Sequence, residues 1–367
     1  MSRDERTTTG PMDGETHAHS RSDGAAIRQL EPRRGIELAG LGLVAALAAA
    51  MVGFVALDWL RHVLSPAALL FEQFLIVGMW LDYYLGTNVF QHAFMWRQIA
   101  TGVCIGIVAP LVGTYLVHRQ MALIGETLAH TAFAGVAVGL IFTGLTGWSG
   151  SLLWIALVVG VLGALAVQWL TEHTTAFGDV PIAIMLTGSF AVGTLLISWG
   201  RSSMSIAIDI EGYLFGNLSV VTADGARMMA ILSVAVVAVV AATYKQLLFI
   251  TFDEQAARVA RLNVRWYNTL LIVMTAVVVV GAMQVLGVIL VAGMLVIPVA
   301  TASQIARSFR ETLYCSILFG QCAILGGFAL ALGLDLPSGG SIIVVAILFY
   351  LCSIALSDRS AAAISMH

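Results

Sequence analysis

The sequence is poor in charge. Only 11% of its 367 residues are Asp, Glu, Lys or Arg, against roughly 25% in a typical soluble domain. Apolar residues make up 59%, and they come in blocks of about twenty residues separated by short charged stretches. This pattern excludes an ordinary soluble domain and favours a bundle of membrane-spanning helices over a barrel. The net charge of −3 gives no indication of a nucleic-acid partner.

Lysine is almost absent, since Lys245 stands alone against seventeen arginines. A phosphate-binding Walker loop needs a lysine directly before its Ser or Thr, whereas Lys245 precedes Gln246. The chain therefore has no ATPase loop of its own, and we do not expect it to be an enzyme. Its four cysteines lie singly in apolar runs without a C-x-x-C pair, which indicates core residues rather than a metal or redox site.

Composition divides the chain into three parts. Residues 1–35 are polar and balanced in charge, which predicts a disordered cytoplasmic tail. Residues 36–96 are expected to hold one extra transmembrane helix and an extracellular or interfacial segment. Residues 97–357 form the main membrane domain. No cleavable signal peptide fits, because the first apolar run begins only at Ile36.

The apolar runs predict an all-α polytopic membrane protein with about ten transmembrane helices. Two further stretches, Pro66 to Tyr84 and Ser202 to Val221, carry two carboxylates each, and we interpret them as interfacial or re-entrant because two charges in one span are costly. The ten predicted spans are Ile36 to Leu57, Gln98 to Val117, Met121 to Thr143, Trp148 to Leu170, Pro181 to Trp199, Ala226 to Thr243, Trp266 to Met283, Val285 to Ser303, Thr312 to Gly333 and Ser341 to Leu356.

Positive charge predicts the orientation of these spans. With the N-terminus inside, fourteen Arg and Lys residues fall on the cytoplasmic side and four fall outside. Positively charged loops stay in the cytoplasm, so both termini are predicted to be cytoplasmic. If either carboxylate-bearing stretch crossed the membrane, this bias would fall.

Glu126 and His130 are the ionisable pair within the predicted spans. They are four residues apart, so they share one face of a helix, which continues through Ala134 and Ala137. His130 would lie about 13 Å into the membrane at ~1.5 Å per residue. A carboxylate and an imidazole on adjacent turns suit Zn²⁺ or Mn²⁺, although water, another helix or a second subunit must complete the coordination. The structural alternative is a Glu–His hydrogen bond that locks two helices together.

The segment from Lys245 to Asn263 is predicted to be a cytoplasmic loop that contains a short surface helix. Asp253 is placed to cap the N-terminus of this helix, and Glu254 and Arg258 form an i,i+4 pair on it. Arg258 and Arg261 lie toward the negative end of its dipole. Such a helix is either a connector or a projection that docks into a partner.

Together with these features, five segments resemble the permease family of ATP-binding-cassette importers for zinc and manganese. They are Gly113 to Gly139, Gly212 to Asn217, Phe249 to Leu262, Val285 to Ala302 and Asp335 to Ser341. They occur in the family's order between residues 97 and 356, so the resemblance assigns residues 97–357 to an importer permease domain. The family more often has Asp at the position of Glu126.

The resemblance implies a multi-pass protein of the plasma or inner membrane. Its expected partners are a second permease subunit, a dimer of cytoplasmic ATPases and an extracellular metal-binding protein. The ATPases would grip the coupling helix through Phe252, Asp253, Glu254, Arg258 and Arg261. Glu126 and His130 would bind the transported ion, Zn²⁺ or Mn²⁺ with Fe²⁺ as a further candidate, and no resident cofactor is implied.

Three other functions compete with this interpretation. A proton-coupled secondary metal transporter would also use a buried Glu–His pair, but it would not need a docking helix. A permease for a metal chelate such as a siderophore would share the ATPase partners without needing Glu126 and His130. An intramembrane metalloprotease would require H-E-x-x-H or a comparable set, whereas this chain has E-x-x-x-H.

Overall fold

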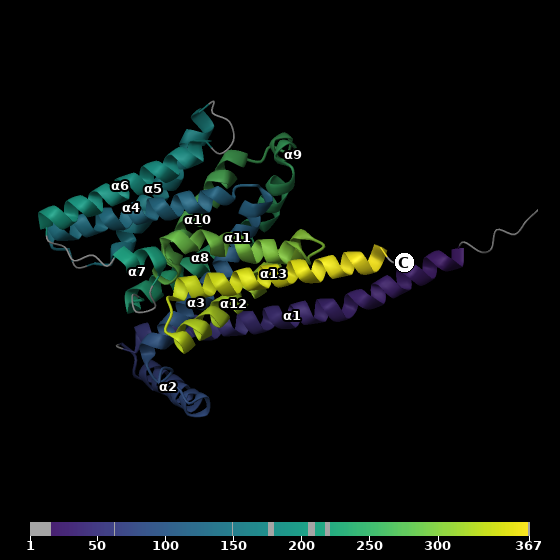
Figure 1. Cartoon of the computed structure of the whole chain (residues 1–367), viewed down its shortest axis with the longest axis horizontal. Coiled ribbons are helices and arrows are strands. Elements are labelled where there is room, and N and C mark those ends of the chain that lie inside the picture. Colours follow the sequence, from purple (N-terminus) through teal and green to yellow (C-terminus); the bar gives the residue numbers. More distant parts are fainter. Residues whose placement is uncertain are drawn as a thin grey trace, which may run out of the picture. The chain divides into compact units, whose positions relative to one another are not determined.

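The structure, a computed structural model, describes residues 16–61, 63–148, 150–174, 180–204, 210–216 and 221–365. Within these ranges it is helical and contains no strand, which confirms the predicted fold class (Figure 1). Its helices are α1 (Thr16–Leu60), α2 (Ser65–Leu85), α3 (Ala93–His118), α4 (Ala122–Thr146), α5 (Leu152–His173), α6 (Val180–Met204), α7 (Ile210–Phe215), α8 (Ala223–Phe252), α9 (Glu254–Val259), α10 (Val264–Leu286), α11 (Val288–Ser303), α12 (Phe309–Leu334) and α13 (Ser338–Ser365).

The chain divides into two units, residues 1–45 and 46–367, and α1 contributes to both. Residues 16–35 were expected to belong to a disordered tail, but in this structure they continue α1. The rest of that predicted tail lies outside the described residues. All the contacts discussed below belong to the second unit.

Among the described residues, ten helices are long and apolar enough to cross a membrane. This number agrees with the prediction, but the ten helices are not all the predicted ones. Ser65–Leu85 qualifies by length and composition, although its two carboxylates had argued against a span. Val288–Ser303 has only 16 residues and is a shorter apolar helix. The stretch from Ser202 to Val221 lies partly outside the described residues; α6 ends within it at Met204, and α7 is the short helix that follows.

The prediction of a loop from Lys245 to Phe252 was wrong. Helix α8 continues through these residues and reaches 30 residues in length. Polar side chains such as Lys245 and Gln246 do not end a helix that emerges from the membrane, since straight-chain polar residues are good helix formers in water. The true break falls at Asp253, which has extended backbone between α8 and α9.

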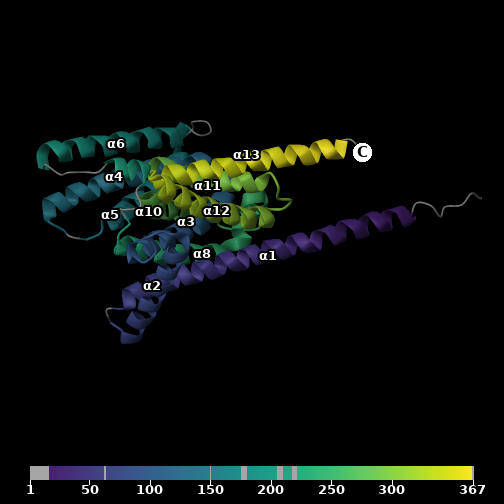
Figure 2. The ribbon, with the colours of Figure 1, turned by 60° about the horizontal axis from the view of Figure 1, so that its bottom comes forward.

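Helix α3 lies at the centre of the bundle. It packs against α8, α10, α11 and α12, and 89% of its most apolar window is buried. Gly113 permits its closest approach to α11, because a Cβ added there would lie 1.9 Å from the carbonyl oxygen of Leu295. Helix α4 packs beside this centre against α5, α6, α10 and α11. Figure 2 shows the same bundle from a second direction.

Three glycines, Gly216, Gly287 and Gly339, meet at the α10–α11 joint. Gly216 and Gly287 both have positive φ, of 76° and 80°, and an added Cβ on either would collide with the backbone of the other. Gly339 at the start of α13 approaches the carbonyl oxygens of Leu286 and Phe215. The neighbouring Ser338 hydroxyl donates to the carbonyl of Val285 at 3.1 Å. The joint therefore leaves no room for side chains at these glycines.

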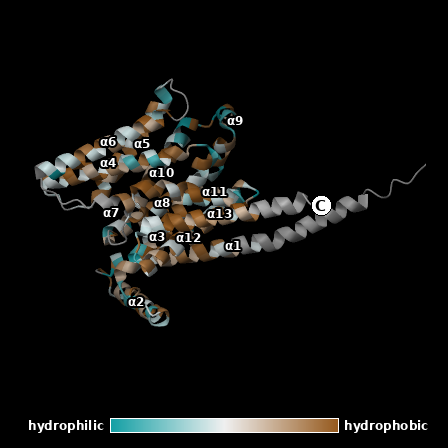
Figure 3. Cartoon of the chain, in the orientation of Figure 1, coloured by the Kyte–Doolittle hydropathy of each residue, from teal (hydrophilic) through white to brown (hydrophobic). Residues whose placement is uncertain are grey.

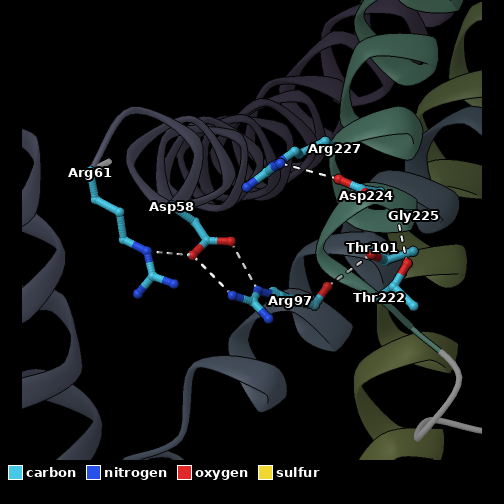
Figure 4. Close-up of polar contacts among 8 residues, drawn as sticks. All are labelled: Asp58, Arg61, Arg97, Thr101, Thr222, Asp224, Gly225 and Arg227. Carbon is cyan, nitrogen blue, oxygen red and sulfur yellow. Dashed lines mark hydrogen bonds and ion pairs between the residues drawn. The ribbon is translucent and has the colours of Figure 1, made fainter. Parts of the chain in front are cut away.

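A buried carboxylate ties the end of α1 to the start of α3 (Figure 4). Asp58, with a side chain 2% exposed, accepts hydrogen bonds from Nε and Nη2 of Arg97 at 2.9 and 3.0 Å. Nε of Arg61 lies 3.3 Å from the same carboxylate, and its guanidinium lies over the ring of Phe71 in α2. Asp58, Arg61 and Arg97 thus form a clasp that joins the extra N-terminal helix to the central helix.

Candidate metal path and coupling helix

Helix α4 carries both predicted metal ligands. Glu126 lies about 6 Å and His130 about 12 Å along the axis from the first residue of the helix, at ~1.5 Å per residue. Glu126 is exposed on the surface of this chain, and His130 is half-buried. The predicted placement on one helix is confirmed, with the acid nearer the α3–α4 corner and the histidine deeper in the bundle.

The imidazole of His130 is oriented by a ring contact rather than by a hydrogen bond. It lies edge-on to Phe190 of α6, with centroids 5.0 Å apart, and Phe190 also stacks on Phe133 at 5.9 Å. Nδ1 of His130 is buried and has no hydrogen-bond partner among the described residues. No hydrogen bond joins it to Glu126 there, so the described contacts do not include the proposed Glu–His lock. An unpaired imidazole nitrogen is free to accept a metal ion.

The small residues beyond His130 are packed against neighbouring helices and leave no open space between them. Ala134 is buried, and a Cβ added at Gly193 of α6 would lie 3.3 Å from its Cα. A Cβ added at Gly135 would lie 2.9 Å from the Cα of Ala156 in α5, which is closer still. These residues let α4, α5 and α6 pack tightly, as small residues do between membrane helices.

A cavity of about 480 Å³ lies along the C-terminal half of α6, and its lining includes Thr194, Ser198 and Arg201 but neither Glu126 nor His130. Phe133 and Phe190 form its inner wall, and these are the rings that contact or adjoin His130. Within the described residues no group of three or more His, Cys, Asp or Glu side chains could hold a metal ion. A metal at Glu126 and His130 therefore needs further ligands from water or from another subunit.

The predicted coupling helix is present as α9. Oδ1 of Asp253 accepts a hydrogen bond from the backbone N–H of Ala256 at 2.8 Å, which confirms the predicted cap. The i,i+4 contact between Glu254 and Arg258 is also present. Ala257 is fully buried in a cluster with Ile250 and Val264, which anchors the helix to the ends of α8 and α10.

The outward side of α9 is charged around an apolar centre. Val259 is 85% exposed, and Arg258, Ala260 and Arg261 are exposed beside it. Arg261 has a positive φ of 60° and closes the short helix. In Figure 3 this region stands out as hydrophilic against the brown helices of the bundle. It lies at the opposite end of the bundle from α7 (Figure 1).

Phe252 connects α9 to two other helix ends. Its ring lies edge-on to His118 at the end of α3, with centroids 6.3 Å apart, and to Phe309 at the start of α12, at 5.6 Å. His118 and Phe309 also contact each other at 4.9 Å. Phe252 is nevertheless 65% exposed. The predicted coupling residues are therefore brought together at one corner of the structure.

Arg119 belongs to this corner and was missed by the sequence reasoning. Its Nη2 lies 2.7 Å from Oδ1 of Asn268 in α10 and 3.7 Å from Oε2 of Glu254. Burial lowers the pKa of its guanidinium, while the nearby charge of Glu254 opposes that shift. In the sequence Arg119 counted only as one more cytoplasmic positive charge, and no local pattern distinguishes it from the exposed arginines.

Comparison with known proteins places these features in a family. The ABC 3 transport family matches residues 91–357. The chain belongs to this family. The matched region of this ABC 3 protein contains α3 to α13 up to residue 357, and thus Glu126, His130 and the whole of α9. The clasp residues Asp58 and Arg61 precede it.

Individual relatives cover most of the same region of this ABC 3 family member. The manganese transport system membrane protein MntC of Listeria innocua is 28% identical over 263 residues, 72% of this chain and 90% of its own. The high-affinity zinc uptake system membrane protein ZnuB of Haemophilus influenzae is 26% identical over 266 residues, covering 72% and 98%. A solved structure, PsaBC from Streptococcus pneumoniae in complex with Fab, matches with a TM-score of 0.63 and 30% identity, covering 72% and 91%.

Proposed function

We propose that this chain is the permease subunit of an importer that moves Mn²⁺ or Zn²⁺ into the cytoplasm on energy supplied by a separate ATPase. The observation that carries the proposal is the pair Glu126 and His130 on α4, in which Glu126 is exposed on the single chain and His130 is half-buried. The names of the Listeria and Haemophilus relatives support the two metals.

The donor chemistry of the pair fits the proposed cargo. A neutral imidazole nitrogen and a carboxylate bind divalent transition metals well, and both sit on one helix face. Nδ1 of His130 is buried without a partner among the described residues. The site holds too few ligands for a permanent structural metal, which usually has four. An incomplete site is what transport requires, because the ion must leave again.

A second copy of this chain is the partner that we propose for the Glu126 face. A charged side chain inside a membrane costs roughly 2.5 to 3.5 kcal/mol even on insertion scales, and Glu126 is exposed on the single chain. A face of this kind has to meet water or protein rather than lipid. In a symmetric dimer each copy would contribute one acid and one histidine, which brings four ligands to the axis.

We propose that α9 is the contact for the ATPase. Its anchor, Ala257, is buried, while its exposed apolar centre at Val259 is flanked by Arg258 and Arg261. A rigid helix with this surface suits docking into a groove on a partner. An extracellular binding protein that delivers the metal is the remaining partner that an importer of this type requires.

Reconstitution tests the proposal directly. The permease, its ATPase and its metal-binding protein are placed in vesicles, and uptake of radioactive Mn²⁺ and Zn²⁺ is measured with and without ATP. We expect uptake that requires ATP and both partners. Uptake by the permease alone, driven by a proton gradient, would instead establish a secondary transporter.

A further inference from the structure

We propose that Arg119 is a positioning residue that transmits movement of α9 to α4, the helix that bears Glu126 and His130. The inference rests on the proposed function, because it assumes that an ATPase moves α9. It assigns a role to a residue that lies outside both the metal pair and the exposed docking surface.

The contacts of Arg119 connect three elements. Its guanidinium reaches Glu254 at the start of α9 and Asn268 in α10, at 3.7 and 2.7 Å. Its backbone N–H donates to the carbonyl of Tyr115 and so closes α3. The side chain is only 9% exposed. A buried charge with these partners cannot be displaced without moving its neighbours, because leaving it unpaired is costly.

The turn between α3 and α4, which contains Arg119, is short and its backbone is constrained. Helix α3 ends at His118 and α4 begins at Ala122. Between them Gln120 takes a positive φ of 58°, and the N–H of Met121 donates to the carbonyl of Leu116 at 2.9 Å. A displacement at Arg119 is therefore passed to the first turn of α4. Glu126 lies only about one helical turn further on.

The other described partner of Glu254 cannot perform this task. Arg258 is on α9 itself, four residues away, and its side chain is 68% exposed. A contact within one helix moves with that helix and transmits nothing to another element. The ring of Phe252 against His118 adds a second, uncharged contact at the same corner. Arg119 thus supplies the charged link between the docking helix and the metal helix.

The test measures the coupling ratio, which is the number of metal ions moved per ATP hydrolysed, in the complete complex. We expect Arg119→Gln to lower this ratio at least tenfold while ATPase binding and basal hydrolysis persist, and Arg119→Lys to retain most of it. The matched control is Arg265→Gln, which breaks the exposed contact of Arg265 with Glu172 at the same end of the bundle without touching α9. It should keep the wild-type ratio.

A double variant tests the specific contact. If Arg119 acts through Glu254, Arg119→Gln combined with Glu254→Gln should be no worse than the more severe single variant. Effects that multiply, or a wild-type ratio in Arg119→Gln, overturn the inference while leaving the proposed function intact. A wild-type complex that shows no ATP-dependent uptake overturns the proposed function itself. If Arg119→Gln does not reach the membrane, the double variant Arg119→Lys with Glu254→Asp replaces it. This variant keeps both charges but widens the distance between the two side chains. An unchanged coupling ratio in it contradicts the inference.

Discussion

The carboxylate of Asp58 is held by the guanidinium of Arg97 through two hydrogen bonds of 2.9 and 3.0 Å. Arg97 lies in the first turns of α3, and the other end of α3 adjoins α9 through His118 and Phe252. The end of α1 therefore lies at the face of the bundle opposite to α9. Helix α2 follows α1 and precedes α3 in the chain, so the contact between Asp58 and Arg97 limits where α2 can lie.

The middle of α2 lies at the level where α3 begins. Phe74 is edge-on to Trp96 at 4.7 Å, and a Cβ added at Gly78 would lie 2.1 Å from the carbonyl oxygen of Phe90. That carbonyl also accepts a hydrogen bond from Trp96. If α2 crossed the bilayer, one of its ends would lie at the level where α3 begins. Its middle would then lie about 15 Å deeper in the membrane.

We therefore predict that α2 does not span the membrane and that both termini are cytoplasmic. In a chain without its native cysteines, Asn88→Cys should react with an impermeant thiol reagent added outside intact cells, whereas Ala25→Cys should react only after permeabilisation. The orientation bias of the positive charges gives the same answer. Labelling of Ala25→Cys from outside would show that α2 crosses.

The clasp itself should contribute to stability. Asp58→Asn keeps the side-chain volume but leaves Arg97 without a charge partner, and breaking a buried pair costs about 3 kcal/mol or more. We expect a clear fall in the Tm of the purified protein in detergent. Glu172→Gln is the control, because its partner Arg265 is 78% exposed and an exposed pair contributes at most about 1 kcal/mol. Equal Tm values for both variants would mean that the clasp is not stabilising.

The sequence was sufficient to predict most helices, because the thickness of the bilayer imposes a length on each apolar run. It was also sufficient to place Glu126 and His130 on one helix and to identify the cap at Asp253, since both features depend on residues within one helix or one turn. The continuation of α8 to Phe252 was missed because hydropathy marks the end of the membrane, not the end of a helix.

Contacts between distant segments could not be predicted in the same way. Asp58 and Arg97 are 39 positions apart in the sequence, and Arg119 contacts Asn268 across 149. Asp58, Arg97 and Arg119 look like ordinary charges near the ends of apolar runs until the helices are packed. Glu126 is a further example, because its exposure on the single chain depends on how α4 packs in the bundle and leaves no local pattern in the sequence.

Two adjacent glycines at the start of α13 should respond differently to the same substitution. A Cβ at Gly339 would lie 2.2 Å from the carbonyl oxygen of Leu286, whereas a Cβ at Gly340 would meet nothing within 4 Å. Overpacking of this kind costs about 1 to 3 kcal/mol, and alanine gains up to about 1 kcal/mol over glycine within a helix. We expect Gly339→Ala to lower the Tm and Gly340→Ala to leave it unchanged or higher. A tolerated Gly339→Ala would mean that the α10–α11 joint is loose.

The metal pair gives the sharpest test of function. Glu126→Gln keeps the volume of the side chain but removes its negative charge, so a residue that only packs should tolerate it. We expect radiometal uptake to fall at least about tenfold in Glu126→Gln and in His130→Ala, because each loses a ligand. Glu126→Asp should retain part of the uptake, since it keeps the carboxylate one methylene further back.

The matched control for the metal pair is Glu72→Gln, which removes an exposed carboxylate from the apolar helix α2 and should leave uptake unchanged. Membrane insertion and ATPase assembly are measured in every variant, so that loss of uptake is not confused with loss of the complex. Wild-type uptake by Glu126→Gln would reduce the pair to a structural contact. If uptake is lost in Glu126→Gln and recovered in Glu126→Asp, the position requires a negative charge. A residue that only packs would not require one.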